Sequence, residues 1–479
     1  MANLPMTDFQ DQVQKLGPGA EVRLSLSQKL FGFFAVLIFF TIGTVLNFSF
    51  LTYMQIVIGV CTVFFVLLLG FSLKVVISGV QKDSIISMNP EEIDDLYSTQ
   101  LPFITIIVAA YKEANVIKKL VESMQGLYYP ESRKEVIIVL EEKDTETIEA
   151  ISLVELPSNF KVVIRPHGGV KTKPAALNYL FETGYVSQES NITVVFDAED
   201  EPNRNQLLQA VKAFEKSWEI NPSVVVVQAR LAFSQNATAN WLTQMLNLDY
   251  INHFGLVLPG LSRLGYISPL GGTSNYILTD VIRELLWDKD NVTEDLDLAV
   301  RLARLGLGIR VFESTTAEEA VESPRDFVNQ RSRWIKGGIQ TYFRHMRNPV
   351  NLYQDLGPER FISFQFVVGA PLLLNLVNPI FWSMTLFYAV THAEFVQMLY
   401  PPVIFYLGSV AFVFGNFAYI YFLMVASFKT KQYGSVFYAL FSPIYWILLS
   451  IAGMKAAKEF AIPSQTHKWA KTEHKGRKR

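Results

Sequence analysis

The sequence predicts an α/β domain with a mostly parallel sheet, combined with an α-helical transmembrane region. Of the 479 residues, 50% are hydrophobic, and the mean hydropathy of +0.23 is too high for a purely soluble protein. Long uncharged runs lie near the N-terminus and in the last third of the chain. Between them, short β-rich runs alternate with helical patterns. The middle of the chain is therefore predicted to fold outside the membrane that the flanking regions enter.

The overall charge and the cysteine count exclude several classes of protein. A net charge of -2 argues against nucleic acid as a partner, because a protein that follows phosphates carries a basic excess. The single cysteine, Cys61, lies in an apolar run. An internal disulfide and a cysteine-based metal site are therefore excluded.

Residues 1–30 are polar and are predicted to form a cytosolic N-terminal segment. No charged residue occurs from Phe31 to Leu73, a length that suits two helices, so residues 31–78 are predicted to form a transmembrane hairpin. Lysine and arginine flank this run on both sides, which places both flanks in the cytosol by the positive-inside rule. The apolar run is too long for the core of a cleaved signal peptide.

Residues 100–337 have the composition of an α/β domain. Its β-rich runs cover residues 103–110, 136–140, 161–164, 192–196 and 224–228. Strands that alternate with helices form a mostly parallel sheet, and ligands bind such a sheet at the carboxyl ends of its strands. Acidic residues recur at these ends, which makes this edge the predicted site.

The richest of these strand ends is Asp197-Ala198-Glu199-Asp200. Three carboxylates around one turn repel one another, and a divalent cation such as Mg²⁺ or Mn²⁺, which prefers oxygen ligands, would compensate them. Lys171 and Lys173 form a basic pair that suits a diphosphate. Taken alone, the acids also fit a solvated loop and the lysines a surface pair.

A second acidic segment, Thr293-Glu294-Asp295, opens an amphipathic helical pattern. A threonine cap followed by acids in the first turn is also an ordinary helix start, because both suit the helix dipole. Further along, Gln330, Arg333 and Trp334 supply an amide, a cation and a flat ring. A carboxylate, a cation and an aromatic ring in one region suggest sugar chemistry at a membrane.

The last third of the chain returns to the membrane. Residues 338–360 mix aromatic and basic side chains and are predicted to form an interfacial helix, and residues 361–428 a second transmembrane hairpin. Residues 432–460 are predicted to form a re-entrant or broken membrane segment, because a simple crossing would export the basic tail. A fifth full span remains the alternative. Residues 461–479 form that basic cytosolic tail.

The motifs occur in the order seen in membrane-bound family 2 glycosyltransferases, so residues 102–337 resemble the processive β-glycan synthases of cellulose, glucomannan, chitin and hyaluronan. The segments that carry the resemblance are Tyr111-Lys112-Glu113, Glu141-Glu142, Lys173-Pro174-Ala175-Ala176-Leu177-Asn178, Asp197-Ala198-Glu199, Thr293-Glu294-Asp295 and Gln330-x-x-Arg333-Trp334. The tail Trp469-Ala470-Lys471-Thr472-Glu473-His474 is also similar to the end of β-glycan synthases.

The resemblance implies a GT-A fold, a UDP- or GDP-linked sugar donor and an inverting single displacement. It places Asp295 as the general base with Glu294 beside it in the catalytic set. Carried over position by position, the other implied roles are metal binding by Asp197 with Glu199 or Asp200, and substrate binding by Tyr111, Glu113, Glu141, Lys173, Asn178, Gln330, Arg333 and Trp334. Lys112, Glu141-Glu142 and the stretched Asp197-x-Glu199-Asp200 depart from the family pattern, which leaves open whether Glu199 or Asp200 ligates the Mg²⁺ or Mn²⁺.

The sequence therefore predicts a multi-pass membrane enzyme with a cytosolic catalytic domain, in the plasma membrane if the source is prokaryotic. The leading function is processive extension of a β-linked polysaccharide with coupled translocation across the lipid bilayer. A transferase that adds one sugar to a lipid acceptor is the alternative enzyme. A third hypothesis is a sensor that binds nucleotide sugar without catalysis. The presence of the complete set of acids, arginine and tryptophan argues against this hypothesis.

Overall fold

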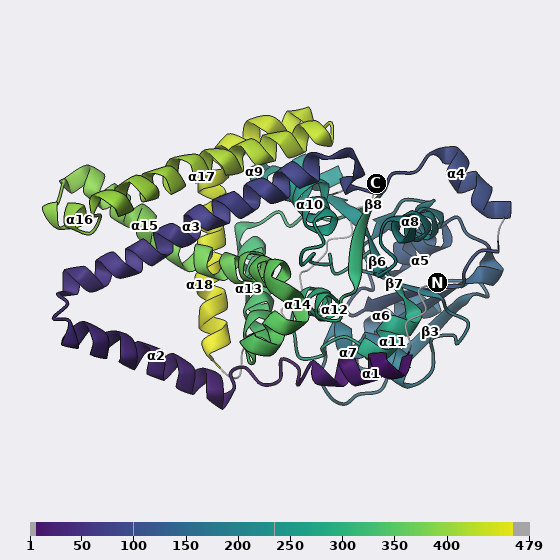
Figure 1. Ribbon diagram of the computed structural model, residues 1–479. Helices are drawn as coiled ribbons and strands as arrows, with labels where there is room; N and C mark the ends of the chain where they lie inside the picture. The colour runs from purple at the N-terminus through teal and green to yellow at the C-terminus, as the bar shows by residue number, and fades with distance from the viewer. Residues whose placement is uncertain (1–5, 99, 234, 463–479) are drawn as a thin grey trace.

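The computed structural model describes residues 6–98, 100–233 and 235–462 of the chain. Figure 1 shows a domain built around a sheet and, beside it, long helices that extend away from it. The middle of the sequence forms the sheet domain, whereas the long helices come from both sides of it in the sequence. The two apolar parts of the chain therefore meet in space, where α3 (Phe50–Val80) packs against α17 (Pro402–Lys429).

One mixed sheet of eight strands, in the order β3-β2-β1-β4-β7-β6-β8-β5, forms the centre of the domain. The strands are β1 (Ile104–Ala110), β2 (Lys134–Glu141), β3 (Phe160–Arg165), β4 (Ile192–Phe196), β5 (Glu201–Pro202), β6 (Val224–Phe233), β7 (Asn275–Leu278) and β8 (Gly308–Glu318). The neighbours β3, β2, β1 and β4 are parallel, as are β6 and β8. β7 is antiparallel to β4 and to β6, and β5 is antiparallel to β8. The predicted α/β fold is confirmed, and the sheet, predicted to be mostly parallel, is mixed.

Helices cover both faces of the sheet and bury its apolar strands between two layers of side chains. The covering helices are α1 (Met6–Lys15), α5 (Ile117–Gln125), α6 (Thr145–Ser152), α7 (Lys173–Glu182), α8 (Gln206–Ile220), α11 (Thr279–Leu285) and α12 (Glu294–Arg304). One core lies under α5, α6 and α8, and the other under α1, α7, α11 and α12. The continuous apolar runs of β1, β2 and β4 follow from this burial on both faces.

The remaining elements lie on the connections of the domain or in its helical neighbour. Short 3-10 turns occupy Lys82–Ser84, Asp95–Ser98, Glu131–Arg133 and Gln235–Thr238, and α4 spans Pro90–Asp94. The further helices are α2 (Leu26–Val45), α9 (Trp241–Asn252), α10 (Leu258–Arg263), α13 (Pro324–His345), α14 (Pro349–Phe364), α15 (Ala370–Thr391), α16 (Glu394–Met398) and α18 (Ser442–Ala461), with π-helical turns η5 (His253–Val257) and η6 (Gln365–Gly369) and the 3-10 helix η7 (Tyr433–Phe441).

Five helical segments within the described residues are long and apolar enough to cross a membrane. They are Leu26–Val45, Phe50–Val80, Pro349–Thr391, Pro402–Lys429 and Tyr433–Ala461. The segment predicted to be interfacial, residues 338–360, is divided between the end of α13 and most of α14. α18 runs across the direction of α3 and α17 in Figure 1 and packs along α13 and α15. The predicted tail, residues 461–479, lies outside the described residues from residue 463 onward.

The α9–η5–α10 unit joins the sheet domain to the long helices. η5 and α10 pack on α3 with almost no side chain between the backbones, since a Cβ atom on Gly79 of α3 would lie 2.1 Å from the carbonyl oxygen of Leu256 in η5. A Cβ atom on Gly260 would likewise lie 2.1 Å from the carbonyl oxygen of Val75. These two glycines permit the backbones to approach closely, which fixes the sheet domain against α3.

A buried ion cluster fastens α12 to α13. Asp297 on α12 accepts hydrogen bonds from Arg301 at 2.8 Å and from Arg344 on α13 at 2.5 Å, and its other oxygen lies 3.1 Å from Nε2 of His345. Arg344 also donates to Asp288 at 2.8 Å. All these side chains are buried, so each charge depends on its partners for the solvation that water would otherwise provide.

We expect His345 to make the fold sensitive to acid. Burial lowers the pKa of His345 from 6.5 to about 4, so the unfolded chain binds a proton in this range and the folded chain does not. The contribution of neutral His345 to the free energy of unfolding is complete above pH 6.5 and is lost as the pH falls towards 4. The total loss in the free energy of unfolding is on the order of 3 kcal/mol. The apparent melting temperature in nanodiscs should therefore fall more steeply over this range in the wild type than in His345→Gln. His167→Gln, at an exposed histidine, serves as the control, and an equal acid slope in His345→Gln would contradict the assignment.

Candidate active site

The carboxyl ends of the parallel strands bring the predicted residues to one place. Tyr111 and Glu113 follow β1, Glu141 ends β2, and Asp197 follows β4. One cavity of about 1390 Å³ opens at this edge. The predicted residues on its wall are Tyr111, Glu113, Glu141, Lys173, Asp197, Glu199, Glu294, Asp295, Gln330, Arg333 and Trp334.

The acidic turn after β4 places two carboxylates on the cavity wall and one beneath it. Asp197 and Glu199 line the cavity. Asp200 is 1% exposed, and its Oδ2 accepts hydrogen bonds from the backbone N–H of Asp197, at 2.7 Å, and from the hydroxyl of Thr273. Its Oδ1 is buried without a partner among the described residues. Burial and the charges of Asp197 and Glu199 raise the pKa of Asp200, so this turn is short of positive charge.

Lys173 begins α7 and lies among the acids. Its ammonium group donates to Asp197 Oδ1 at 2.5 Å and to the carbonyl oxygen of Gly272 at 2.9 Å. Although burial disfavours the charged form, the charges of Asp197 and Glu294 raise the pKa of Lys173. The lysine therefore stays charged in the site, where it can pair with an anion in place of Asp197.

Glu294 and Asp295 begin α12 inside the same cavity. The side chain of Thr293 does not cap this helix, and its hydroxyl contacts Asn291 at 3.4 Å instead. Asp295 Oδ1 accepts the N–H of Leu296 at 2.8 Å. Burial raises the pKa of Asp295, and burial together with the charge of Asp295 raises the pKa of Glu294 to about 7. Acids that only begin a helix would not need to face a cavity, so the positions of Glu294 and Asp295 on the cavity wall favour a role in the site.

The helix α13 carries the amide, cation and ring. Gln330, Arg333 and Trp334 stand three and four residues apart, so they share one helix face, and all three line the cavity. α13 touches the loop before Glu294, because a Cβ atom on Gly337 would lie 2.1 Å from the hydroxyl oxygen of Thr293. The charges of Glu294 and Asp197 act on Arg333, which places its guanidinium among the acids.

Asn178 takes another position, and Glu141 has a partner outside the cavity. Asn178 is not on the cavity wall, because its side chain binds the backbone of Trp287 through both its amide nitrogen, at 2.7 Å, and its oxygen, at 2.9 Å. It therefore holds the loop that precedes α12. Glu141 does line the cavity, and its carboxylate also pairs with Arg165 of β3 at 2.8 Å.

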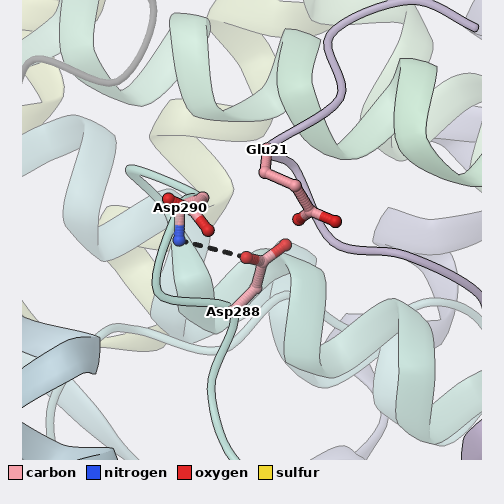
Figure 2. Close-up of side chains that lie close together, drawn as sticks. All are labelled: Glu21, Asp288 and Asp290. Carbon is pink, nitrogen blue, oxygen red and sulfur yellow. Dashed lines mark hydrogen bonds between the residues drawn. The ribbon is translucent and has the colours of Figure 1, made fainter. Parts of the chain in front are cut away.

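A separate acidic cluster lies outside the cavity. Figure 2 shows Glu21, Asp288 and Asp290 with their carboxyl groups close enough to one another to share a cation. Asp288, however, accepts hydrogen bonds from the N–H of Ala20 at 2.7 Å, from the N–H of Asp290 at 3.1 Å and from Arg344 at 2.8 Å. These partners already compensate the carboxylate, so the cluster joins the N-terminal segment to the loop before α12.

Several further polar groups on the cavity wall were not predicted from the sequence. Among them, Asp249 and Asn252 come from the end of α9 and His253 from the start of η5, and Arg331 lies beside Trp334 with its guanidinium carbon 4.3 Å from the ring centroid. The available signal was weak: polar residues recur at positions i, i+3 and i+4 in a largely apolar helix. No pattern in the sequence indicated that this face points to the site.

Comparisons with known proteins agree on the sheet domain. Residues 102–337 match the family model "Glycosyltransferase like family 2". A probable glycosyltransferase, YdaM, from Bacillus subtilis is 24% identical over 391 residues, which are 78% of this chain and 87% of that protein. The mannosyltransferase PcManGT from Pyrobaculum calidifontis, solved in complex with GDP-Man and Mn²⁺, superposes with a TM-score of 0.54 at 16% identity, covering 86% of this chain and 99% of that chain. The fold is therefore that of a GT-A enzyme.

Two further relatives are named for different products. A beta-monoglucosyldiacylglycerol synthase from Trichormus variabilis is 28% identical over 269 residues, 55% of each chain. A probable glucomannan 4-beta-mannosyltransferase from Oryza sativa is 29% identical over 265 residues, 54% of this chain and 44% of the relative. The aligned region spans about half the length of these two synthases.

We expect Glu294 to weaken donor binding as it ionises. Its pKa of about 7 means that it gains a negative charge close to Lys173 and Arg333, the cations that would hold a diphosphate. The Kd of a nucleotide sugar, whose phosphodiester groups do not titrate near neutrality, should rise about 3- to 10-fold between roughly pH 6 and pH 8. Calorimetry on wild type and Glu294→Gln measures this, and the variant should show a flat profile. If the Kd of Glu294→Gln rose with pH as steeply as that of the wild type, another ionising group would be responsible for the pH dependence.

Proposed function

We propose that this nucleotide-sugar-dependent glycosyltransferase extends a β-linked polysaccharide at the membrane. Residues 102–337 form its family 2 glycosyltransferase domain. The observation that carries the proposal is the continuity of the cavity. The same cavity that Asp295 lines continues between α3, α15, α17 and α18. An acceptor can therefore reach the catalytic carboxylate from the side of the apolar helices.

The lining of the helical part of the cavity suits a sugar chain. Aromatic rings can stack on the apolar faces of pyranoses, and amide and hydroxyl groups can bind sugar hydroxyls. Aromatic and polar groups there include Thr62, Asn378, Trp382, Thr385, Tyr388, Tyr400, Ser409, Asn416, Tyr419 and Trp446. Aliphatic side chains and several phenylalanines also line this part of the wall.

The donor would lie over the carboxyl ends of β1, β2 and β4. Tyr111, Glu113 and Glu141 are placed to contact the nucleoside, and Lys173 and Arg333 to hold the diphosphate. These residues come from four parts of the domain, namely the loop after β1, β2, α7 and α13, so the folded sheet is needed to assemble the donor site.

The acidic turn fits a divalent cation. Asp197 and Glu199 present hard oxygen ligands to the cavity, and the unpartnered Oδ1 of Asp200 marks a local excess of negative charge. Bound there, Mg²⁺ or Mn²⁺ would stabilise the negative charge of the departing diphosphate. Asp197 and Glu199 are the proposed ligands, and Asp200 supports the turn through Asp197 and Thr273.

The transfer itself would be a single displacement with inversion. The oxygen of an acceptor hydroxyl forms a bond to the anomeric carbon while the bond from that carbon to the diphosphate oxygen breaks. Asp295 takes the hydroxyl proton, and Lys173 and Arg333 stabilise the charge on the leaving diphosphate. The raised pKa of Asp295 suits a base that must accept a proton and later release it.

The proposed topology is multi-pass with the catalytic domain in the cytosol. Arg23 and Lys29 precede α2, while Lys74 and Lys82 lie at the end of α3, so both ends of this helical hairpin carry positive charge. Lys429 ends α17 and Lys431 follows it, on the same side as the sheet domain. Within residues 432–460 the chain is divided between η7 and α18, and α18 runs across the direction of α3 and α17 in Figure 1, which supports the proposal that this segment is re-entrant or broken. The length and hydropathy of Tyr433–Ala461 also fit a full crossing, which is the alternative.

A lipid acceptor is the second candidate function. The aliphatic part of the cavity wall suits acyl chains as well as it suits a passage, and one relative is a monoglucosyldiacylglycerol synthase. In that case a single sugar would be added to a lipid hydroxyl at the same Asp295. The donor chemistry is shared, so only the product distinguishes the two functions.

Product size is therefore the test of the proposed function. Purified protein in nanodiscs is incubated with Mg²⁺ or Mn²⁺ and a panel of UDP- and GDP-linked sugars, and the labelled product is sized. A polymer made from one donor is the expected result. A single sugar on an extractable lipid would overturn polymer extension in favour of the second candidate.

We expect Asp295→Asn to abolish transfer while donor binding is kept. The amide cannot accept the acceptor proton, so kcat should fall by about 10²- to 10⁴-fold, whereas the Kd of the nucleotide sugar stays near the wild-type value. Turnover and calorimetry measure the two quantities separately. Asn178→Ala is the matched control outside the cavity, expected to act on stability. Wild-type turnover in Asp295→Asn would remove Asp295 from the base role.

A further inference from the structure

Arg331 is a buried cation among the cavity-lining residues of α13. It lies between Gln330 and Trp334 in that helix and is itself 9% exposed. The roles implied for Gln330, Arg333 and Trp334 by the resemblance to family 2 enzymes do not include this arginine. Its contacts are therefore the evidence for what it does.

Hydrogen bonds tie the guanidinium group of Arg331 to two other helices. Its Nη2 donates to Oδ2 of Asp249, on α9, at 2.9 Å and to the hydroxyl oxygen of Tyr445, on α18, at 3.3 Å. The hydroxyl of Tyr445 donates in turn to the same Oδ2 of Asp249 at 3.1 Å. The three groups form a closed triangle that joins α9, α13 and α18, and the carboxylate of Asp249 compensates the buried charge of Arg331.

The same guanidinium group lies over the ring of Trp334. Its carbon is 4.3 Å from the ring centroid, within the range of a cation–π contact. On its other neighbours in α13, the carbon is 5.6 Å from the ring centroid of Phe327, and that ring packs against Tyr445 with the centroids 5.2 Å apart. Arg331 therefore connects the ring of Trp334 to α18.

Packing alone does not fix the ring of Trp334. The side chain is only half-buried, since it contacts an apolar cluster on one side and borders the cavity on the other. A ring in such a position can change rotamer unless a neighbour blocks the movement. The guanidinium group of Arg331 blocks it, because Arg331 cannot move aside without breaking its hydrogen bonds to Asp249 and Tyr445.

We propose that Arg331 is a positioning residue for the transfer, which fixes the ring of Trp334 at the cavity wall and makes its orientation depend on α18 through Tyr445. The inference rests on the proposed function in one respect, because it requires Trp334 to contact a substrate. It holds for a polysaccharide acceptor and for a lipid acceptor alike. α18, the last helix that the structure describes, thereby becomes part of the arrangement that the transfer needs.

A double-mutant cycle on the full chain in nanodiscs tests this role. Tyr445→Phe removes only the hydroxyl of the triangle, and kcat/KM for the product that the wild type forms should fall about 3- to 10-fold, the value of a weakened cation–π contact. The Kd of the nucleotide sugar should stay unchanged, because Lys173 and Arg333 are not members of the triangle. In a Trp334→Leu background, Tyr445→Phe should lower kcat/KM by less than about 2-fold, because the ring that the triangle fixes is already absent.

Tyr438→Phe is the matched control. The hydroxyl of Tyr438 accepts a hydrogen bond from Gln244 at 2.7 Å and so joins η7 to α9, but Tyr438 is not on the cavity wall. A tyrosine that only stabilises the helix packing should have the same effect on kcat/KM with and without the ring of Trp334. The control therefore separates a general loss of packing from the hold on this ring.

The fluorescence of Trp334 decides if Trp334→Leu forms no product. The difference in emission between the wild type and Trp334→Leu isolates this tryptophan, and Tyr445→Phe should raise the rate at which acrylamide quenches it. If Tyr445→Phe no longer binds the donor and has therefore lost its fold, Arg331→Lys takes its place in the same measurements. Lysine keeps the charge but lacks the flat guanidinium group.

The outcomes separate the positioning role from the proposed function. Equal effects of Tyr445→Phe with and without Trp334, or unchanged quenching, would overturn the positioning role in an enzyme that still transfers sugar. A wild type that adds a single sugar to a lipid would overturn polysaccharide extension, and the cycle would still decide on Arg331. A wild type that transfers sugar from no nucleotide sugar would overturn both.

Discussion

The buried carboxylate of Asp297 is the contact on which the site depends. Asp297 stands two residues after Asp295, and its partner Arg344 lies on the helix that carries Arg333 and Trp334. The ion pair therefore sets the distance between the proposed base and the groups that would hold diphosphate and acceptor. Removing one member would leave the other charge buried and unpaired, which costs about 3–5 kcal/mol. Exposed charges in the same places would not hold two helices in a fixed register, because exposed pairs contribute little.

The charges inside the cavity are arranged around a ligand with negative phosphates and a positive ion. Lys173 contacts Asp197 directly, and the acids Glu294 and Asp295 lie close enough to act on it. Binding of a diphosphate would turn Lys173 towards the phosphates and free Asp197 for a cation. The raised pKa values of Asp200, Glu294 and Asp295 have the same origin, because buried acids without enough compensating charge hold their protons more strongly. Charges that are not fully compensated therefore raise the free energy of the empty site, and binding of a diphosphate and a cation would lower it.

Sequence patterns predicted five of the eight strands, and most of the predicted site residues lie on one cavity wall, because strand runs and their acidic ends depend on local order. The run from Ile192 to Phe196 forms β4 within the bounds that its apolar pattern gave, and its acidic end reaches the cavity. Tertiary partners decided what the sequence could not show. Asn178 stands inside a motif but binds the backbone of Trp287, and Asp200 turns to Thr273, because in each case a segment far along the chain supplies the partner. The antiparallel direction of β7 depends in the same way on its pairing with β4 and β6, which are distant from it in sequence.

The part of the cavity wall between the sheet domain and the long helices was the least predictable feature. Its polar residues come from the α9–η5 segment, α13 and α17, which are widely separated in sequence, and Asn252 has no motif to mark it. η5 and α10, which follow α9, pack closely on α3, as Gly79 and Gly260 permit. The same packing joins the catalytic edge of the sheet to the space between the long helices. A transferase whose acceptor came from the aqueous side would not need this connection between the sheet edge and the helices. The connection therefore favours an acceptor that arrives from the membrane or leaves through it.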